Sequence, residues 1–146
     1  MTYLVDTNVI SALAPTNAER PAALIEWLDR RSDDLFLPVV TATEIRAGVA
    51  KAAREGATRK AANLHAWWDA VEHLYGDRIL PFDLKAATIA GALSDRAAAK
   101  GLHPGFADIA VAAIAEAHTL VLLTRNVRHF RAIRDRVIDP FETLPA

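Results

Sequence analysis

Short, continuous apolar runs alternate along this chain with longer alanine-rich segments, and this alternation restricts the possible folds more than any other feature. The runs predict strands at residues 3–5, 36–40, 78–82 and 120–124, with a short fifth at 137–138. They lack the apolar–polar alternation of a strand with one wet face, so both faces of the sheet should be covered. Strands and helices alternating in this way predict an α/β fold with a central parallel sheet of four to five strands.

The segments between the strands carry helical signals. Helices are predicted at residues 41–54, 58–75 and 84–100, around Leu24 and Leu28, and from near Asp108 onward. In the second of these, apolar side chains recur on one narrow stripe formed by Leu64, Trp68, Val71 and Tyr75. Such spacing is typical of a helix packed on a core.

Length and composition narrow the class of protein. With 146 residues, 52% of them hydrophobic, the chain is expected to form one domain over residues 1–146. The absence of cysteine excludes disulfides, thiolate metal sites and a cysteine nucleophile. A formal net charge of -1 means that any nucleic-acid binding must depend on a local basic surface.

The sequence also predicts where the protein works. The longest apolar run, residues 109–115, is far shorter than the roughly 20 residues that span a bilayer. The first residues have no basic lead, and Asp6 interrupts their apolar run, which is unlike a signal peptide. We therefore expect a cytoplasmic protein without a membrane partner.

Acidic and amide residues follow the predicted strands. Asp6 comes directly after the first strand, Glu44 lies four residues after Val40, Asp108 stands near the start of a helix, and Asn126 follows the fourth strand. In parallel sheets, ligands gather beyond the carboxyl ends of the strands. Three carboxylates meeting there would repel one another unless a cation offset them, and their hard oxygens favour Mg²⁺ or Mn²⁺.

The same residues also fit a purely structural role. Residues 41–44 match a capping box in which Glu44 reaches back to the helix start. Asp6 and Asp108 are residue types favoured at helix starts, and Asp83 is expected to cap the helix at 84–100. Spacing alone leaves both interpretations of the acids open.

Several ordered motifs resemble those of PIN-domain ribonucleases, in particular the VapC and FitB-type toxins of toxin–antitoxin pairs. The similar blocks are residues 4–11 (LVDTNVIS), 43–48 (TEIRAG), 80–83 (LPFD), 108–113 (DIAVAA) and 123–130 (LTRNVRHF). Each block is weak by itself. Together they stand in the family's order and cover nearly the whole chain.

The resemblance implies a three-layer α/β/α fold and a Mg²⁺- or Mn²⁺-dependent endoribonuclease that a partner antitoxin inhibits. It places Asp6, Glu44 and Asp108 at the family's acidic, metal-binding positions. Asn126 matches a fourth catalytic position that is often Asp in the family. Supporting roles fall to three further residues, namely Thr7 and Asn8, which would orient Asp6, and Thr124, which matches a hydroxyl near the cluster.

Two surfaces are candidates for contacts with other molecules. Arg125 and Arg128 belong to a recurring set of arginines near the predicted site, and with Arg46 they are candidate contacts for RNA phosphates. A solvated helix face is the competing interpretation. The helix at 58–75 carries Trp67 and Leu74 beside its core stripe, and the resemblance suggests that this flank forms part of a homodimer or antitoxin surface.

Two other functions remain open at this point. One is an aspartyl-nucleophile phosphatase or phosphotransferase built on Asp6, although such enzymes need a second acid where this chain has Asn8. The other is a binding module that kept the fold and lost its activity. The three intact acids weigh against this second alternative.

Overall fold

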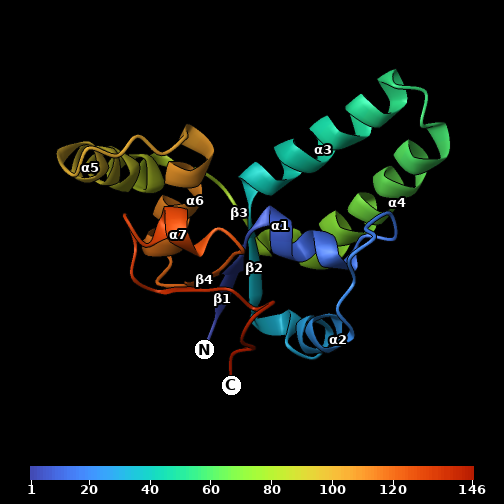
Figure 1. Ribbon diagram of the computed structural model, residues 1–146, viewed down its shortest axis with the longest axis horizontal. Coiled ribbons are helices and arrows are strands. Elements are labelled where there is room, and N and C mark those ends of the chain that lie inside the picture. Colours follow the sequence, from blue (N-terminus) through green and yellow to red (C-terminus); the bar gives the residue numbers. More distant parts are fainter.

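The computed structural model describes residues 1–146 and contains one five-stranded parallel sheet (Figure 1). The strands are β1 (Tyr3–Val5), β2 (Leu35–Pro38), β3 (Ile79–Leu80), β4 (Val121–Leu123) and β5 (Val137–Ile138). They are ordered β3-β2-β1-β4-β5, and every neighbouring pair is parallel. The chain builds outward from β1 to β3 and then returns to β4 on the other side. The strand order therefore reverses beside β1, where such sheets bind ligands.

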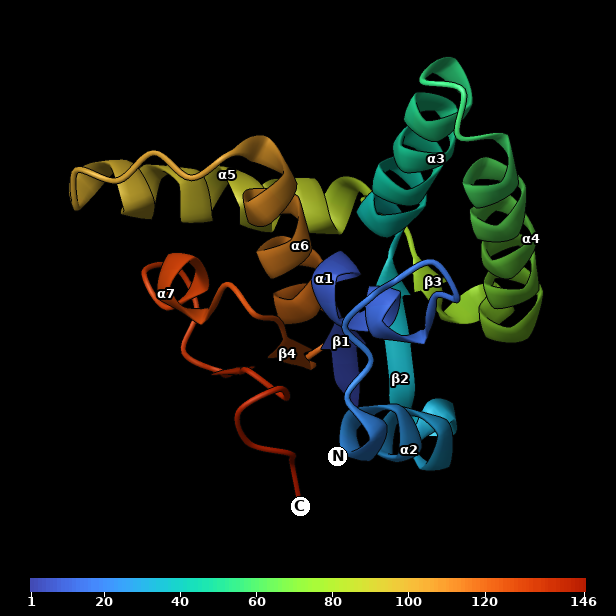
Figure 2. The same cartoon turned by 45° about the vertical axis from the view of Figure 1, so that its right-hand side comes forward.

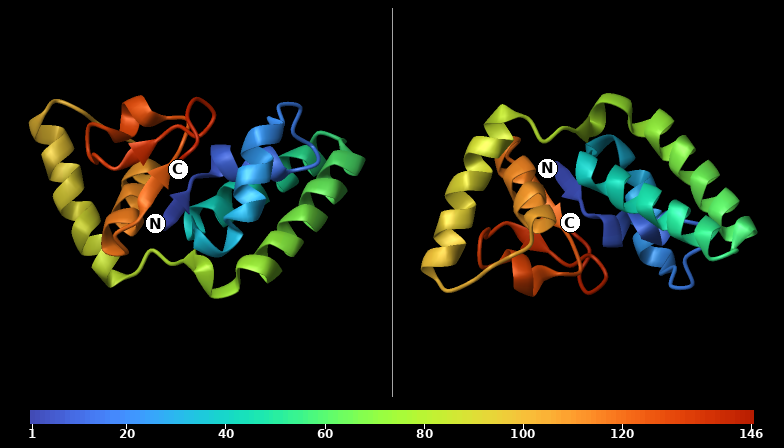
Figure 3. Two further views of the ribbon diagram at one scale, coloured as in Figure 1. Left: turned by 90° about the horizontal axis from the view of Figure 1, so that it is seen from below. Right: turned by 90° about the horizontal axis from the view of Figure 1, so that it is seen from above.

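Helices cover the sheet in two groups. They are α1 (Thr7–Ile10), α2 (Ala22–Arg30), α3 (Val39–Arg54), α4 (Thr58–Tyr75), α5 (Leu84–Ala99), α6 (Phe106–Ala117) and α7 (Val127–Phe130). The pair α3–α4 and the pair α5–α6 stand apart from each other on the two sides of the strands (Figure 2). Viewed from above and from below, both termini lie between these pairs, near the strands (Figure 3).

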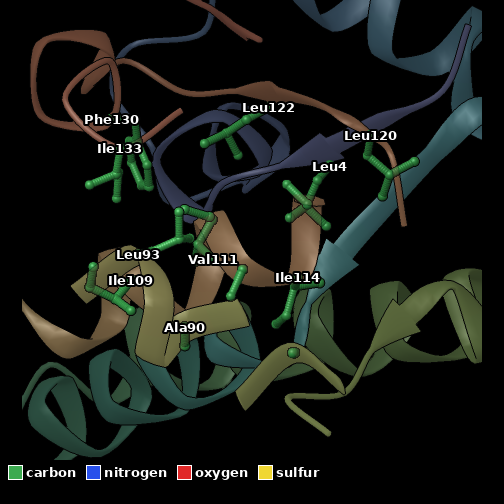
Figure 4. Close-up of a cluster of buried hydrophobic side chains, with 14 of the residues drawn as sticks. Leu4, Ala90, Leu93, Ile109, Val111, Ile114, Leu120, Leu122, Phe130 and Ile133 are labelled. Atoms are coloured by element: carbon green, nitrogen blue, oxygen red, sulfur yellow. The ribbon is translucent and has the colours of Figure 1, made fainter. Parts of the chain in front are cut away.

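Side chains of successive strand residues enter two different cores. Leu4 and Leu122 pack with α5, α6 and Phe130 in one core (Figure 4). Val5 and Leu123, their neighbours in sequence, pack in the other core with residues of α1, α2 and α4. Adjacent strand residues point to opposite faces of a sheet, so continuous apolar runs are what two buried faces require. The expected α/β/α layering and parallel sheet are confirmed.

The sequence predicted every strand, but the strands predicted at 78–82 and 120–124 are shorter in the structure, at 79–80 and 121–123. The bounds of β1, β5 and α4 are confirmed, and the stripe on α4 buries Trp68, Val71 and Tyr75. The predicted strand at 36–40 instead ends at Pro38, and Val39 begins α3. Val40 packs against the core from this helix, so its burial there outweighs the strand preference of a β-branched residue.

This boundary removes the capping-box interpretation of Glu44. Pro38 is the N-cap of α3, which places Thr41 inside the helix and Glu44 at its sixth residue. The predicted cap at Asp83 is confirmed, because its carboxylate accepts a hydrogen bond from Ala86 N at 2.9 Å. None of the helices is long and apolar enough to cross a membrane.

Candidate active site

Asp6 stands at the carboxyl end of the central strand β1. Its backbone N–H donates to Leu123 O on β4 at 2.9 Å, which fixes its position against the neighbouring strand. Its side chain caps α1, with Oδ1 accepting from Thr7 N at 2.9 Å. Only 7% of the residue is exposed. Asp6 is thus a helix cap, as the structural interpretation proposed, and its second oxygen remains available for another role.

Thr124 holds that second oxygen. Its fully buried hydroxyl donates to Asp6 Oδ2 at 2.8 Å. The Thr124 hydroxyl oxygen accepts hydrogen bonds from Asn126 N at 3.1 Å and from Asn8 Nδ2 at 3.4 Å. Asn8 Oδ1 in turn accepts from Arg125 N at 3.2 Å. A hydroxyl with one proton and two lone pairs is fully used in this arrangement, so the orientation of the Asp6 carboxylate is fixed.

Glu44 is linked to the same centre through Thr7. The Thr7 hydroxyl donates to Glu44 Oε1 at 2.7 Å, and its oxygen lies 2.9 Å from the hydroxyl oxygen of Thr41. Thr41 is fully buried at the start of α3. Thr41 is not among the residues that the sequence predicted for the site, although a polar residue on the buried side of a helix that directly follows a strand is a signal for one.

Asp108 and Asn126 complete the group without tight packing. Asp108 is the third residue of α6, whose N-cap is Gly105, and no hydrogen bond involves its side chain. It is half-buried, whereas Asn126 is exposed at the start of α7. The cap interpretation of Asp108 is therefore wrong, since Gly105 occupies that position.

These residues line one pocket of about 230 Å³. Its walls are formed by Asp6, Thr7, Asn8, Glu44, Ala107, Asp108, Val111 and Asn126. The pocket brings together all three predicted acids, and no Lys, Arg or His lines it. Burial raises the pKa of Asp6, and the charges of Glu44 and Asp108 raise it further, while the hydrogen bonds from Thr124 and Thr7 oppose this change.

The pocket has the chemistry of a site for a hard divalent cation. Its polar atoms come from carboxylates, a hydroxyl and amides, which suit Mg²⁺ or Mn²⁺. No three of the His, Asp and Glu side chains are close enough together to hold one ion directly. Mg²⁺ retains several of its waters when bound to one or two carboxylates, so a hydrated ion fits this spacing.

The predicted arginine contacts differ in their environments. Arg46 points to α4, where it pairs with Asp69 at 2.8 Å and Glu72 at 3.2 Å. Arg125 pairs with Glu19 at 2.8 Å and lies over the ring of Phe141. Arg128 is exposed, and neither a salt bridge nor a hydrogen bond involves its side chain. Of the three, Arg128 has the guanidinium that is free to bind a phosphate.

The predicted dimer flank forms a shallow groove away from the pocket. Trp67 and Leu74 on α4 line it together with Leu13, Ile25 and Leu28, and its volume is about 320 Å³. Leu74 is 62% exposed, whereas Trp67 is half-buried against the core. The use of this groove by a second copy or by an antitoxin stays a prediction.

Comparison with known protein families shows which family contains this pocket. The model of the PIN domain matches residues 3–135, a span that contains every residue of the pocket. The chain belongs to the PIN-domain family. This PIN domain includes all the blocks on which the resemblance was based, from Leu4 to Phe130.

The similarity to individual relatives covers nearly the whole chain. The chain is 35% identical over 140 residues to the VapC ribonuclease Y4jK of Sinorhizobium fredii, and the match covers 95% of this chain and 97% of the relative. It is 35% identical over 141 residues to Toxin FitB of Neisseria gonorrhoeae, covering 94% and 97%. The crystal structure of FitAcB from Neisseria gonorrhoeae superposes with a TM-score of 0.84 at 32% identity, covering 96% of this chain and 99% of that one.

Proposed function

We propose that this PIN-domain protein is a Mg²⁺- or Mn²⁺-dependent endoribonuclease and the toxin of a toxin–antitoxin pair. The observation that carries the proposal is a pocket with three carboxylates and no basic side chain at the switch point of the sheet. Keeping such charges together is unfavourable unless a cation offsets them. Because the protein keeps these three carboxylates together despite their repulsion, we expect the pocket to bind a cation.

The residues have separable roles in this proposal. Asp6, Glu44 and Asp108 would hold a hydrated ion, with one or two carboxylates bound directly and the rest through its waters, and Asn126 would add a neutral oxygen at the pocket edge. When bound, a divalent ion lowers the pKa of water and neutralises charge on phosphate oxygens, which is what phosphodiester hydrolysis requires. Thr124, Asn8 and Thr7 keep the carboxylates oriented before substrate binds, so little reorganisation is needed during the reaction.

The comparisons support the choice of RNA and of a protein partner. Relatives that cover at least 94% of this chain are named as a VapC ribonuclease and as Toxin FitB. Because the similarity covers the whole pocket, we extend ribonuclease activity and the toxin role to this chain. An antitoxin is the partner that such a toxin requires, and a homodimer remains part of the prediction.

A charge-neutral substitution tests the proposal. Asp108→Asn keeps the size of the side chain and leaves the N-cap at Gly105 intact. We expect RNA cleavage in Mg²⁺ or Mn²⁺ to fall by at least about 100-fold, comparable to losing one preorganised electrostatic contact. The free energy of unfolding should change by less than about 0.5 kcal/mol. Cleavage is measured on total RNA and urea denaturation gives the stability.

Asp95→Asn on α5 is the matched control, because Asp95 is exposed and distant from the pocket residues. It should leave cleavage and stability unchanged. Full activity of Asp108→Asn, or wild-type activity that persists in excess EDTA, would refute the metal-dependent mechanism.

The two alternatives predict other outcomes. A phosphatase would accumulate an aspartyl-phosphate on Asp6, but Asn8 binds Thr124 and Arg125 N instead of supplying a second acid. A silent binding module would show no cleavage and no heat of Mn²⁺ binding at millimolar metal. Calorimetry with Mn²⁺ on wild type and Asp108→Asn separates this alternative from the proposed nuclease.

A further inference from the structure

A second hollow adjoins the candidate active site and has no assigned role. The loop at residues 102–105, Asp108, Arg128 and His129 enclose about 430 Å³ between the start of α6 and α7. We call it the α7 hollow. Asp108 also lines the acidic pocket, so one side chain forms a wall of both spaces. A ligand in the α7 hollow would lie directly beside the proposed reaction centre.

The walls of the α7 hollow differ in chemistry from those of the acidic pocket. Arg128 contributes a guanidinium without an ion-pair partner, and His103 and His129 contribute two exposed imidazoles. Guanidinium groups bind phosphate oxygens with two parallel hydrogen bonds. Imidazole rings both hydrogen-bond phosphates and stack on bases of single-stranded RNA. The volume falls in the range of about 300–1,000 Å³ that is typical of small-ligand sites.

A larger depression adjoins the α7 hollow on the side away from the acidic pocket. Arg128 is also part of the wall of this depression of about 770 Å³, where Arg125 and Arg131 add two further guanidinium groups and Asp139 and Glu142 add two carboxylates. Asp108 and Arg128 thus connect three adjacent spaces in series, from the acidic pocket outward. Such a series suits an extended polyanion better than a single free nucleotide.

We propose that the α7 hollow is the subsite for the RNA nucleotide next to the scissile phosphate. This inference rests on the proposed ribonuclease function. Arg128 and His129 contact the phosphate of that nucleotide from the α7 side. His103 and Pro104 offer ring faces to its sugar and base from the loop side. From there the strand continues along Arg128 toward the larger depression.

Substitutions of two exposed residues test the subsite. Arg128→Ala should raise KM and lower kcat/KM for RNA cleavage by about 10-fold, the equivalent of one charge-assisted contact. His129→Ala should lower kcat/KM in the same direction. Arg59→Ala and His73→Ala on α4 are matched controls, because both residues are exposed and lie outside all three spaces. Controls and wild type should have equal kcat/KM.

Salt dependence identifies the contact as one to phosphate. Binding of a single-stranded RNA of about 12 nucleotides is measured by fluorescence anisotropy in EDTA, across a range of NaCl concentrations. Arg128→Ala should reduce the slope of log K against log salt by about 0.7, the value for one lost phosphate contact. Arg128→Lys should keep the slope and recover part of the affinity, since the charge remains.

The outcomes separate this inference from the proposed function. If wild type cleaves no RNA with either metal, the ribonuclease proposal fails. If wild type cleaves and Arg128→Ala behaves like Arg59→Ala in both kcat/KM and salt slope, the subsite is refuted while the nuclease stands. Loss of antitoxin binding with normal RNA cleavage would assign the α7 hollow to the protein partner and would also refute the subsite.

Discussion

Two clusters of charged side chains on this PIN domain differ in charge balance: one contains only acids, and the other pairs acids with a basic residue. In the acidic pocket, Asp6, Glu44 and Asp108 line the same space, and no Lys, Arg or His lines it to balance them. Between α3 and α4, Arg46 lies between Asp69 and Glu72, and His65 completes the group. The first cluster includes a carboxylate that is 7% exposed, whereas the second lies at the surface.

The two clusters differ in how the charges of their carboxylates are balanced. In the α3–α4 cluster, Arg46 lowers the pKa of Asp69, because its guanidinium favours the charged carboxylate. In the acidic pocket, burial and neighbouring acids raise the pKa of Asp6. The protein thus keeps an unfavourable charge arrangement at the rim and supports it with neutral hydroxyls and amides. Asp6 is the buried member of this cluster, whereas Glu44 is exposed and Asp108 is half-buried, and a buried carboxylate with a raised pKa beside other acids is common in active sites.

The largest effect in this comparison is expected from the support of the acidic pocket. Thr124→Val removes a buried hydroxyl and leaves Asp6 Oδ2, Asn8 Nδ2 and Asn126 N without that partner. We expect a loss of about 1–3 kcal/mol in the free energy of unfolding. Cleavage should fall by about 10–100-fold, as for other residues that orient metal ligands. Urea denaturation and initial cleavage rates measure the two effects.

Thr88→Val on α5 is the control for this substitution, because the Thr88 hydroxyl is exposed and bonds only within its own helix. Its effect on stability should stay within about 0.5 kcal/mol. Equal stability of the two variants would show that the buried hydrogen bonds of Thr124 do not hold the rim together.

The second effect concerns pH. The pKa of Asp6 is higher in the folded state than in the unfolded chain. Between these two pKa values, the folded protein keeps the Asp6 proton that the unfolded chain has lost. The free energy of unfolding should therefore fall as pH rises from the ordinary Asp pKa through the raised value, and stay lower above it. Asp6→Asn removes this fall and should be the more stable protein at pH 7 in EDTA.

Subtracting the two denaturation curves at each pH isolates the contribution of Asp6 from that of the other acids. Added Mn²⁺ should then stabilise wild type more than Asp6→Asn, since the variant has lost one of the three carboxylates that would hold the ion. A wild-type protein that gains stability relative to Asp6→Asn as pH rises would contradict the direction of the pKa shift.

The smallest effect is expected in the balanced cluster. Arg46→Ala removes an exposed ion pair, and such pairs contribute about 0–1 kcal/mol. RNA cleavage should not change, because the guanidinium is already engaged by Asp69 and Glu72 on α4. A loss of activity as large as that of Arg128→Ala would restore Arg46 as an RNA contact.

Much of the fold was determined by local sequence. Apolar runs without alternation specified a parallel sheet with two covered faces, and the stripe on α4 specified which side of that helix is buried. The residue at which α3 begins could not be predicted from the local sequence. Val39 and Val40 both favour a strand by themselves, yet both are helical in the structure, where Val40 packs against the core and Val39 is exposed.

The sequence by itself indicated which acids come together in one pocket, because Asp6 follows a strand, Asp108 lies near a helix start and the motifs that hold all three acids stand in the PIN order. Only the tertiary structure decided how those acids are held and what lies beside them. The hydrogen bond from Thr124 to Asp6 joins residues 118 positions apart, and the α7 hollow joins a loop at 102–105 to Arg128 and His129. No local pattern encodes such contacts, since they exist only once the strands have set the distances between their ends.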